Sequence, residues 1–137
     1  MRDTELRVRY SETDQMGVVY HSNYLIWFEI GRTEYLRDLG LEYSELEKLG
    51  VMVPVLEARC RYRQPAKYDD MLTIETKLAE IGKAKFHFEY RVIRKRDGAL
   101  LAEGSTEHIF VNSGFKPINI RKIHPKVWEK LSGAEIA

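Results

Sequence analysis

Three residues suited to carbonyl chemistry lie close together near the start of the chain: Asp14, Gly17 and His21. They come just before an apolar, aromatic run at residues 23–30, which is typical of a helix that begins there. A carboxylate either attacks a carbonyl carbon or activates water for the attack. The free N–H groups at a helix N-terminus stabilise the negative charge that then grows on oxygen. Glycine at position 17 lets the backbone turn so that the carboxylate faces the helix.

Each of these residues also has a purely structural interpretation. An aspartate in a short loop often accepts a hydrogen bond from its own backbone, and from the local sequence alone this Asx-turn is the more common role for Asp14. The His21 side chain either orients a substrate or the Asp14 carboxylate, or simply packs at the helix start. No second histidine stands at metal-ligand spacing, since the others are His87, His108 and His124. We therefore expect neither a metal nor a cofactor.

Composition sets the broad class of the protein. The chain has 137 residues, of which 44% are hydrophobic and 31% charged, and we expect one domain over residues 1–137. A net charge of +1 gives no support to nucleic-acid binding or a polybasic membrane anchor. No apolar run approaches the roughly 20 residues that cross a bilayer. The single cysteine, Cys60, and the charged first residues favour a reducing, cytoplasmic setting.

The first half of the chain predicts one strand, one long helix and then one short helix at "YSELEKLG". Residues 5–10 alternate apolar and charged side chains, as a half-buried strand does. Ser22 or Asn23 is suited to begin the helix and Gly40 to end it. Apolar side chains lie nearly all round residues 24–30, which predicts burial on most sides, as in a helix wrapped by a sheet.

The second half predicts four strands, because the pattern changes to period two. The runs are residues 51–64, 70–81, 85–95 and 99–112. The pair Asp97-Gly98 predicts a hairpin, and Pro125 is suited to begin a closing helix. Consecutive strands with short connections are expected to pair antiparallel. The predicted fold class is α+β, with a curved antiparallel sheet wrapped around the long helix.

Four segments resemble one known family. They are "TDQMGVVYHSNY", "RTEYLRDLG", "RYRQPAKYDD" and "FVNSGFKPINI". Together they are similar to the 4-hydroxybenzoyl-CoA thioesterase family, in its YbgC-type acyl-CoA thioesterase branch. Met16 is a departure, because some members carry a second small residue there. The resemblance implies the hotdog fold and hydrolysis of an acyl-CoA to a free acid and CoA.

The resemblance also assigns roles to individual residues. It implies that Asp14 is the catalytic carboxylate and that the amide polarising the thioester carbonyl is the backbone N–H of His21. It makes acyl-CoA the partner and implies a homodimer or homotetramer, because members join two sheets edge to edge. Whether Asp14 is nucleophile or general base stays open, as does the acyl group.

The resemblance also implies which residues bind the substrate, and some of these residues have a structural alternative. The candidate residues are Gly17, Tyr20, Tyr24, Lys83 and Lys85. Tyr20 and Tyr24 line an acyl pocket or belong to the core, and the two lysines contact CoA phosphates or mark a solvated face. The alternative function for the whole chain is a non-catalytic module that binds acyl-CoA or acyl-carrier protein.

Overall fold

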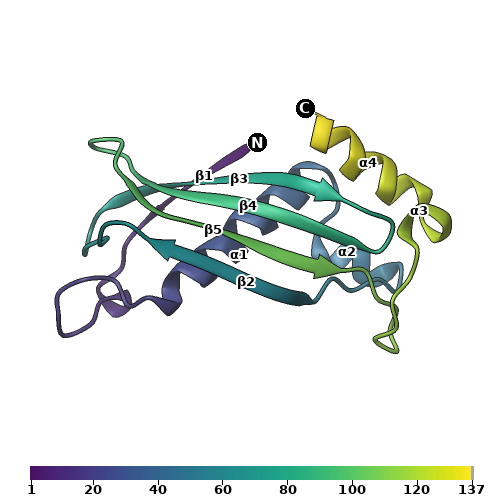
Figure 1. The fold of residues 1–137 in the computed structure, drawn as a ribbon, viewed down its shortest axis with the longest axis horizontal. Coiled ribbons are helices and arrows are strands. Elements are labelled where there is room, and N and C mark those ends of the chain that lie inside the picture. Colours follow the sequence, from purple (N-terminus) through teal and green to yellow (C-terminus); the bar gives the residue numbers. More distant parts are fainter. Residues whose placement is uncertain (137) are drawn as a thin grey trace.

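A five-stranded antiparallel sheet packs against helix α1 in the computed structural model, which describes residues 1–136 (Figure 1). The elements in chain order are β1 (Arg2–Arg7), a short 3-10 helix (Tyr10–Glu12), α1 (Ser22–Asp38), α2 (Tyr43–Lys48), β2 (Val55–Tyr62), β3 (Met71–Ile81), β4 (Lys85–Arg94), β5 (Leu100–Ile109), α3 (Ile120–Ile123) and α4 (Pro125–Ile136). The predicted order of strands and helices is confirmed, including the closing helix that begins at Pro125.

Helix α1 buries one stripe of side chains against the sheet. The buried positions recur at spacings of three and four: Tyr24, Trp27, Phe28, Gly31, Arg32, Tyr35 and Leu36. The expectation that Ser22 or Asn23 caps the helix is wrong, because His21 is the N-cap residue and no side chain caps the first turn. Gly40 follows its end with a positive φ of 72°, and the N–H of Leu41 returns to the carbonyl of Leu36 at 2.8 Å. This is a glycine-dependent helix stop of the kind that the sequence predicted.

The opposite side of α1 remains open to solvent. Leu25, Ile26 and Ile30 are 39%, 49% and 38% exposed. The prediction that the apolar run is buried on most sides is therefore wrong for a single chain. The sheet covers the stripe that faces it and leaves the other apolar side chains uncovered.

The strands are arranged in the order β1-β3-β4-β5-β2, and every neighbouring pair is antiparallel. The expectation that consecutive strands are neighbours holds for β3, β4 and β5 but fails for β2, which pairs with β5 at the far edge. Residues 63–70 must therefore cross from one side of the sheet to the other. This crossover segment passes the N-terminal end of α1, because the N–H of Val19 donates to the carbonyl of Ala66 at 2.9 Å.

The inner strands bury the side chains that the alternation predicted. On β3 the buried residues include Leu72, Ile74 and Leu78, and on β4 they are Phe86, Phe88, Tyr90 and Val92. The β4–β5 hairpin is confirmed, with Gly98 at a φ of 70°. The edge strand β2 behaves differently, because its apolar residues Val55, Leu56 and Tyr62 are 45–48% exposed.

Two glycines let α1 lie close to the sheet. A Cβ at Gly31 would come within 2.3 Å of Thr76 Oγ1, and one at Gly104 within 2.6 Å of the Phe28 ring. The Phe28 ring also stacks on Tyr90, with centroids 4.3 Å apart. No larger residue fits at either position without moving the helix.

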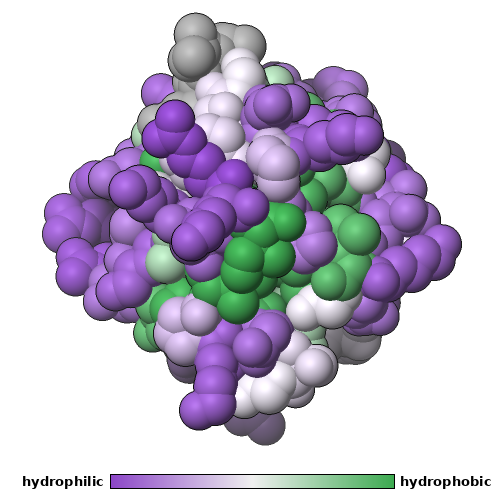
Figure 2. Space-filling model, turned by 90° about the vertical axis from the view of Figure 1, so that its right-hand side faces the viewer, coloured by the Kyte–Doolittle hydropathy of each residue, from purple (hydrophilic) through white to green (hydrophobic). Residues whose placement is uncertain are grey.

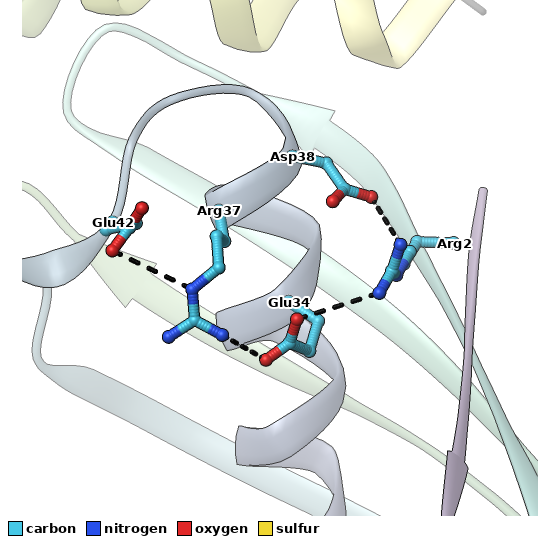
Figure 3. Close-up of polar contacts among 5 residues, drawn as sticks. All are labelled: Arg2, Glu34, Arg37, Asp38 and Glu42. Carbon is cyan, nitrogen blue, oxygen red and sulfur yellow. Dashed lines mark hydrogen bonds and ion pairs between the residues drawn. The ribbon is translucent and has the colours of Figure 1, made fainter.

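Ion pairs fasten the end of α1 to its neighbours, as Figure 3 shows. Arg2 of β1 contacts Asp38 at 2.7 Å and Glu34 at 3.6 Å. Arg37 pairs with Glu34 and lies 3.7 Å from Glu42, which precedes α2. These side chains are partly exposed, so each pair contributes no more than about 1 kcal/mol to stability.

A chain of hydrogen bonds runs through the core beneath α1. Burial lowers the pKa of His108 to about 4, so its ring is neutral near pH 7. Nδ1 lies 3.1 Å from the carbonyl of Val53, which only accepts, and Nε2 must therefore accept from the Thr106 hydroxyl at 2.8 Å. Thr106 in turn accepts from Tyr90 at 2.6 Å, which leaves the Tyr90 oxygen to accept from Arg32.

His108 makes stability depend on pH. Between its usual pKa of 6.5 and its folded value of about 4, the unfolded chain takes up a proton that the folded chain excludes, so stability falls as the pH drops through this range. The difference corresponds to roughly 3 kcal/mol of unfolding free energy. We expect His108→Gln to flatten this fall in urea unfolding from pH 7 to pH 4. His124→Gln, as the control, should retain it, and equal slopes for His108→Gln and the parent would contradict the assignment.

Candidate active site

Asp14 belongs to a tight loop that folds back on itself. Its N–H donates to the carbonyl of Val18 at 2.9 Å, and its carbonyl accepts from Gly17 N–H at 3.0 Å. Gly17 has a φ of 78°, which favours glycine. Oδ1 of Asp14 accepts from the N–H of Met16 at 2.9 Å. The Asx-turn is therefore present, and it fixes one carboxylate oxygen while Oδ2 has no hydrogen bond within residues 1–136.

The buried carboxylate of Glu12 ties this loop to α1. Glu12 is only 5% exposed. Its two oxygens accept from Trp27 Nε1 at 3.0 Å and from the backbone N–H of Arg9 at 2.8 Å. Its carbonyl accepts from Tyr20 N–H at 2.9 Å and from the Asn23 amide at 3.0 Å. The entry and exit of the loop are thus held to the first turns of the helix.

A cavity of about 370 Å³ lies beside this loop and the start of α1. It is lined by Asp14, by loop residues 16 and 18–21, by Tyr24 of α1, and by residues 62–65 at the end of β2. Three segments far apart in the sequence therefore meet here. The structure brings together Asp14, Tyr20, His21 and Tyr24 around one space, with Gly17 in the turn that shapes the loop.

Tyr24 and Tyr62, in the wall of the cavity, are neutral hydroxyls at ordinary pH. Burial raises the pKa of Tyr24, and burial with a hydrogen bond to Cys60 raises that of Tyr62 to about 12. The Tyr24 oxygen accepts from the N–H of Ala66 at 3.2 Å, and its ring is 2% exposed. Tyr24 thus serves core packing and the cavity wall together, whereas Tyr20 is 49% exposed.

His21 stands immediately before the first residue of α1. Its carbonyl accepts from the Tyr62 hydroxyl at 3.1 Å, and its ring lies 4.5 Å from that of Tyr20, centroid to centroid. We find no acceptor for the His21 backbone N–H anywhere in the described part of the chain. His21 lines the cavity together with Asp14, and a free N–H at a helix N-terminus suits a negatively charged oxygen.

Comparisons with known proteins identify the family. Residues 8–129 match the model of the thioesterase-like superfamily. The chain belongs to this superfamily. It is 41% identical over 122 residues to the putative acyl-CoA thioesterase YneP of Bacillus subtilis, covering 88% of each chain. It is 37% identical over 119 residues to the acyl-CoA thioesterase YbgC of Haemophilus influenzae, covering 85% of this chain and 86% of that one.

A solved structure supports the same conclusion for the fold. The DHNA-CoA thioesterase of Staphylococcus aureus superimposes with a TM-score of 0.92 at 33% identity, covering 98% of this chain and 90% of that one. The hotdog fold implied by the sequence resemblance is therefore confirmed. The expected enzyme class, a thioester hydrolase, is confirmed by membership of the superfamily.

Lys83 and Lys85 of this thioesterase lie at the other end of the sheet from Asp14. Lys85 pairs with Ile109 at the end of β5, whereas Tyr62 beside the cavity pairs with Ala102 near its start. Lys83 lines a separate hollow of about 350 Å³ with Asn119, Arg121 and Lys122. Figure 2 faces this end of the molecule, where hydrophilic side chains surround a small apolar area. Within one chain, the structure does not bring the lysines to the cavity.

Sequence reasoning missed several residues of the site. Glu12 carried no signal of its role, because only the folded chain shows its carboxylate against Trp27. A signal for Tyr62 and the crossover segment was present, because both lie in the "RYRQPAKYDD" run. The resemblance included this run but did not assign it to the site. Arg121 and Lys122 were readable as positive charge, although not as neighbours of Lys83.

Within residues 1–136, no group of three or more histidine, cysteine, aspartate or glutamate side chains is placed to hold a metal ion. In the same residues, no helix has the length and apolar character that crossing a membrane requires.

Proposed function

We propose that this thioesterase hydrolyses acyl-CoA thioesters at the cavity beside Asp14, with Asp14 as the catalytic carboxylate and the His21 N–H as the oxyanion donor. The supporting observation is that Asp14 and His21 line one cavity at a helix N-terminus, while Oδ2 of Asp14 and the N–H of His21 have no hydrogen bond within the described chain. The acyl-CoA substrates named for YneP and YbgC support the choice of thioester.

The reaction takes one of two routes. As a general base, Asp14 removes a proton from water, the resulting hydroxide adds to the carbonyl carbon, and the C–S bond breaks to release CoA as the thiol. As a nucleophile, an Asp14 oxygen adds to the carbonyl carbon and expels CoA, and water then hydrolyses the mixed anhydride. In both routes the carbonyl oxygen becomes negative and accepts from the His21 N–H.

A homodimer completes this site in our proposal. The free edge of β2 and the open side of α1 together expose six large apolar residues: Leu25, Ile26, Ile30, Val55, Leu56 and Tyr62. An unpaired edge strand with an apolar surface beside it is a template for another chain. Pairing of two β2 strands about a twofold axis joins the sheets and covers both α1 helices. Further association of dimers gives the homotetramer.

The dimer also brings the lysines to the site. Antiparallel pairing of two β2 strands reverses the second sheet, so its β3–β4 turn comes to the end of the assembly that holds the first chain's cavity. Lys83 and Lys85 of one chain then serve CoA phosphates bound at the other. The alternative function, a non-catalytic acyl-CoA or acyl-carrier-protein binding module, needs no free carboxylate at this place. The cytoplasmic setting expected from the sequence stays a prediction.

Asp14→Asn is expected to lower kcat by about 10²- to 10⁴-fold, which is the usual contribution of a general base. Asparagine retains the Oδ1 acceptor of the Asx-turn, so the loop and the unfolding midpoint should change little. Release of free thiol from acyl-CoA measures the rate. Asp3→Asn, on the exposed side of β1, is the matched control. An Asp14→Asn enzyme as fast as the parent would exclude Asp14 from the chemistry.

Ile26→Lys is expected to weaken the dimer, because it places a charge in the proposed apolar interface. Sedimentation at several protein concentrations should show a dimer or larger assembly for the parent and a shift toward monomer for the variant. Thiol release should fall in parallel with dissociation. A parent that sediments as a monomer and remains fully active would refute the shared site.

Replacing both Lys83 and Lys85 with alanine is expected to raise KM several-fold and to weaken its dependence on salt, since exposed charges are screened over about 10 Å at 0.1 M ionic strength. The value of kcat should change little, because contacts remote from the thioester act equally on the ground and transition states. Lys48→Ala on α2 is the control. An unchanged KM at low and moderate salt would reject the phosphate role.

A further inference from the structure

Arg32 of α1 is a buried cation without a counter-charge. It is 9% exposed, yet no carboxylate of the described residues forms an ion pair with it. Burial by itself lowers the pKa of Arg32, but the hydroxyls of Tyr90 and Tyr43 outweigh burial and the pKa is raised. The side chain is therefore charged at any working pH. Arginine is seldom buried unless it is paired, which makes this one an exception that calls for a partner.

The hydrogen bonds of Arg32 hold its guanidinium in place without neutralising it. Nε donates to the Tyr43 hydroxyl at 3.3 Å. A second bond goes to Tyr90, whose own proton is committed to Thr106 in the chain that ends at His108. A guanidinium has more N–H donors than these two hydroxyls use. The remaining donors are available to an acceptor from outside the chain.

Arg32 also borders open space. It lines two adjoining hollows of about 280 Å³ each, one between α1 and β2 and the other reaching α2. The first is mostly apolar, with walls of Leu25, Ile26, Val55 and Ala58. An apolar groove with one fixed, charged donor is the usual form of a site that binds an apolar chain with a polar end.

This groove and the candidate active site lie along the same two elements, α1 and β2. Tyr24 and Tyr62 line the Asp14 cavity, and Leu25, Ile26, Val55 and Ala58 line the groove. Along α1, Arg32 lies eleven residues beyond His21, or about 16 Å at the helical rise. An extended acyl chain that has its carbonyl at His21 and follows α1 would bring its far end to Arg32.

The acidic side chains that border the groove do not neutralise the charge of Arg32. Glu29 borders both hollows and Glu47 borders one, but both side chains are exposed and neither pairs with Arg32. Water screens exposed carboxylates, whereas the buried guanidinium acts at low dielectric. The unbalanced charge inside the groove is therefore positive.

We propose that Arg32 is a specificity-determining residue that binds a carboxylate at the far end of the acyl group, so that preferred substrates are acyl-CoA thioesters of dicarboxylic acids. This inference rests on the proposed function and names its substrate class. A different occupant, a carboxylate from a second copy of the chain, would make Arg32 an interface residue instead, and the experiment separates the two.

The test compares acyl-CoA substrates of equal length that end in a methyl, a hydroxyl or a carboxylate group, at several chain lengths. For the parent enzyme, kcat/KM should be highest for the carboxylate at the length that spans the groove. In Arg32→Met, the ratio of kcat/KM for the carboxylate substrate to kcat/KM for the methyl substrate should fall by roughly 10- to 100-fold. This is the usual contribution of a hydrogen bond to a charged group. Arg32→Lys should fall in between, because lysine keeps the charge without the planar fork.

Arg37→Met is the matched control, because Arg37 lies on the same helix but pairs with Glu34 and Glu42 at the surface. It should retain the parent ratio. A parent enzyme that shows no preference for the carboxylate, or prefers the hydroxyl, overturns the proposal even if no Arg32 variant folds. A ratio unchanged in Arg32→Met, with dimer dissociation seen in sedimentation, assigns Arg32 to the interface and also overturns it. Failure to hydrolyse any of the substrates would instead refute the proposed function itself.

Discussion

The close contact of α1 with the sheet is the constraint on which the rest of this structure depends. Phe28 lies against Gly104 and stacks on Tyr90, and Gly31 lies against Thr76, at positions where a single added carbon would push the helix away. This contact fixes the axis of the helix. It thereby fixes the place of the helix N-terminus, the direction of its open apolar side and the depth at which Arg32 is buried.

The candidate site depends on that placement through a second, smaller set of contacts. The carboxylate of Glu12 binds Trp27 on the buried stripe of α1, so the loop that carries Asp14 follows the helix. The crossover segment is held from the other side through Ala66, which bonds to Val19 and to Tyr24. A catalytic carboxylate needs this kind of support, because proton transfer and nucleophilic attack both depend on geometry within fractions of an ångström.

The unpartnered surfaces have a common cause. A sheet of five strands covers one side of a helix, and residues 1–136 contain no further layer for the other side. The edge of β2, the open side of α1 and the groove above Arg32 are therefore one region of the molecule. An assembly that covers the apolar part of this region also encloses the groove, which removes water and strengthens the field of the buried guanidinium.

The sequence by itself determined the elements and their order. Period-two patterns located the strands, because side-chain alternation is a local consequence of backbone geometry. The apolar run at residues 23–30 and its boundary residues located α1. Gly40, Gly98 and Pro125 marked boundaries correctly, since their conformational limits are also local. The motif at residues 13–24 likewise indicated the loop and the helix start, and it marked Asp14 as the candidate carboxylate.

Only the tertiary structure decided how these elements meet. Period two cannot tell which strand lies beside which, so the position of β2 at the far edge was not readable. The crossover that supplies Arg63, Gln64 and Pro65 to the cavity was not readable either. An apolar helix face looks the same in sequence whether its own chain or another covers it. Glu12 and Arg32 look like ordinary surface charges in sequence, because burial is a property of the packed chain. The side chains that they contact, Trp27 and Tyr43, are 15 and 11 residues away.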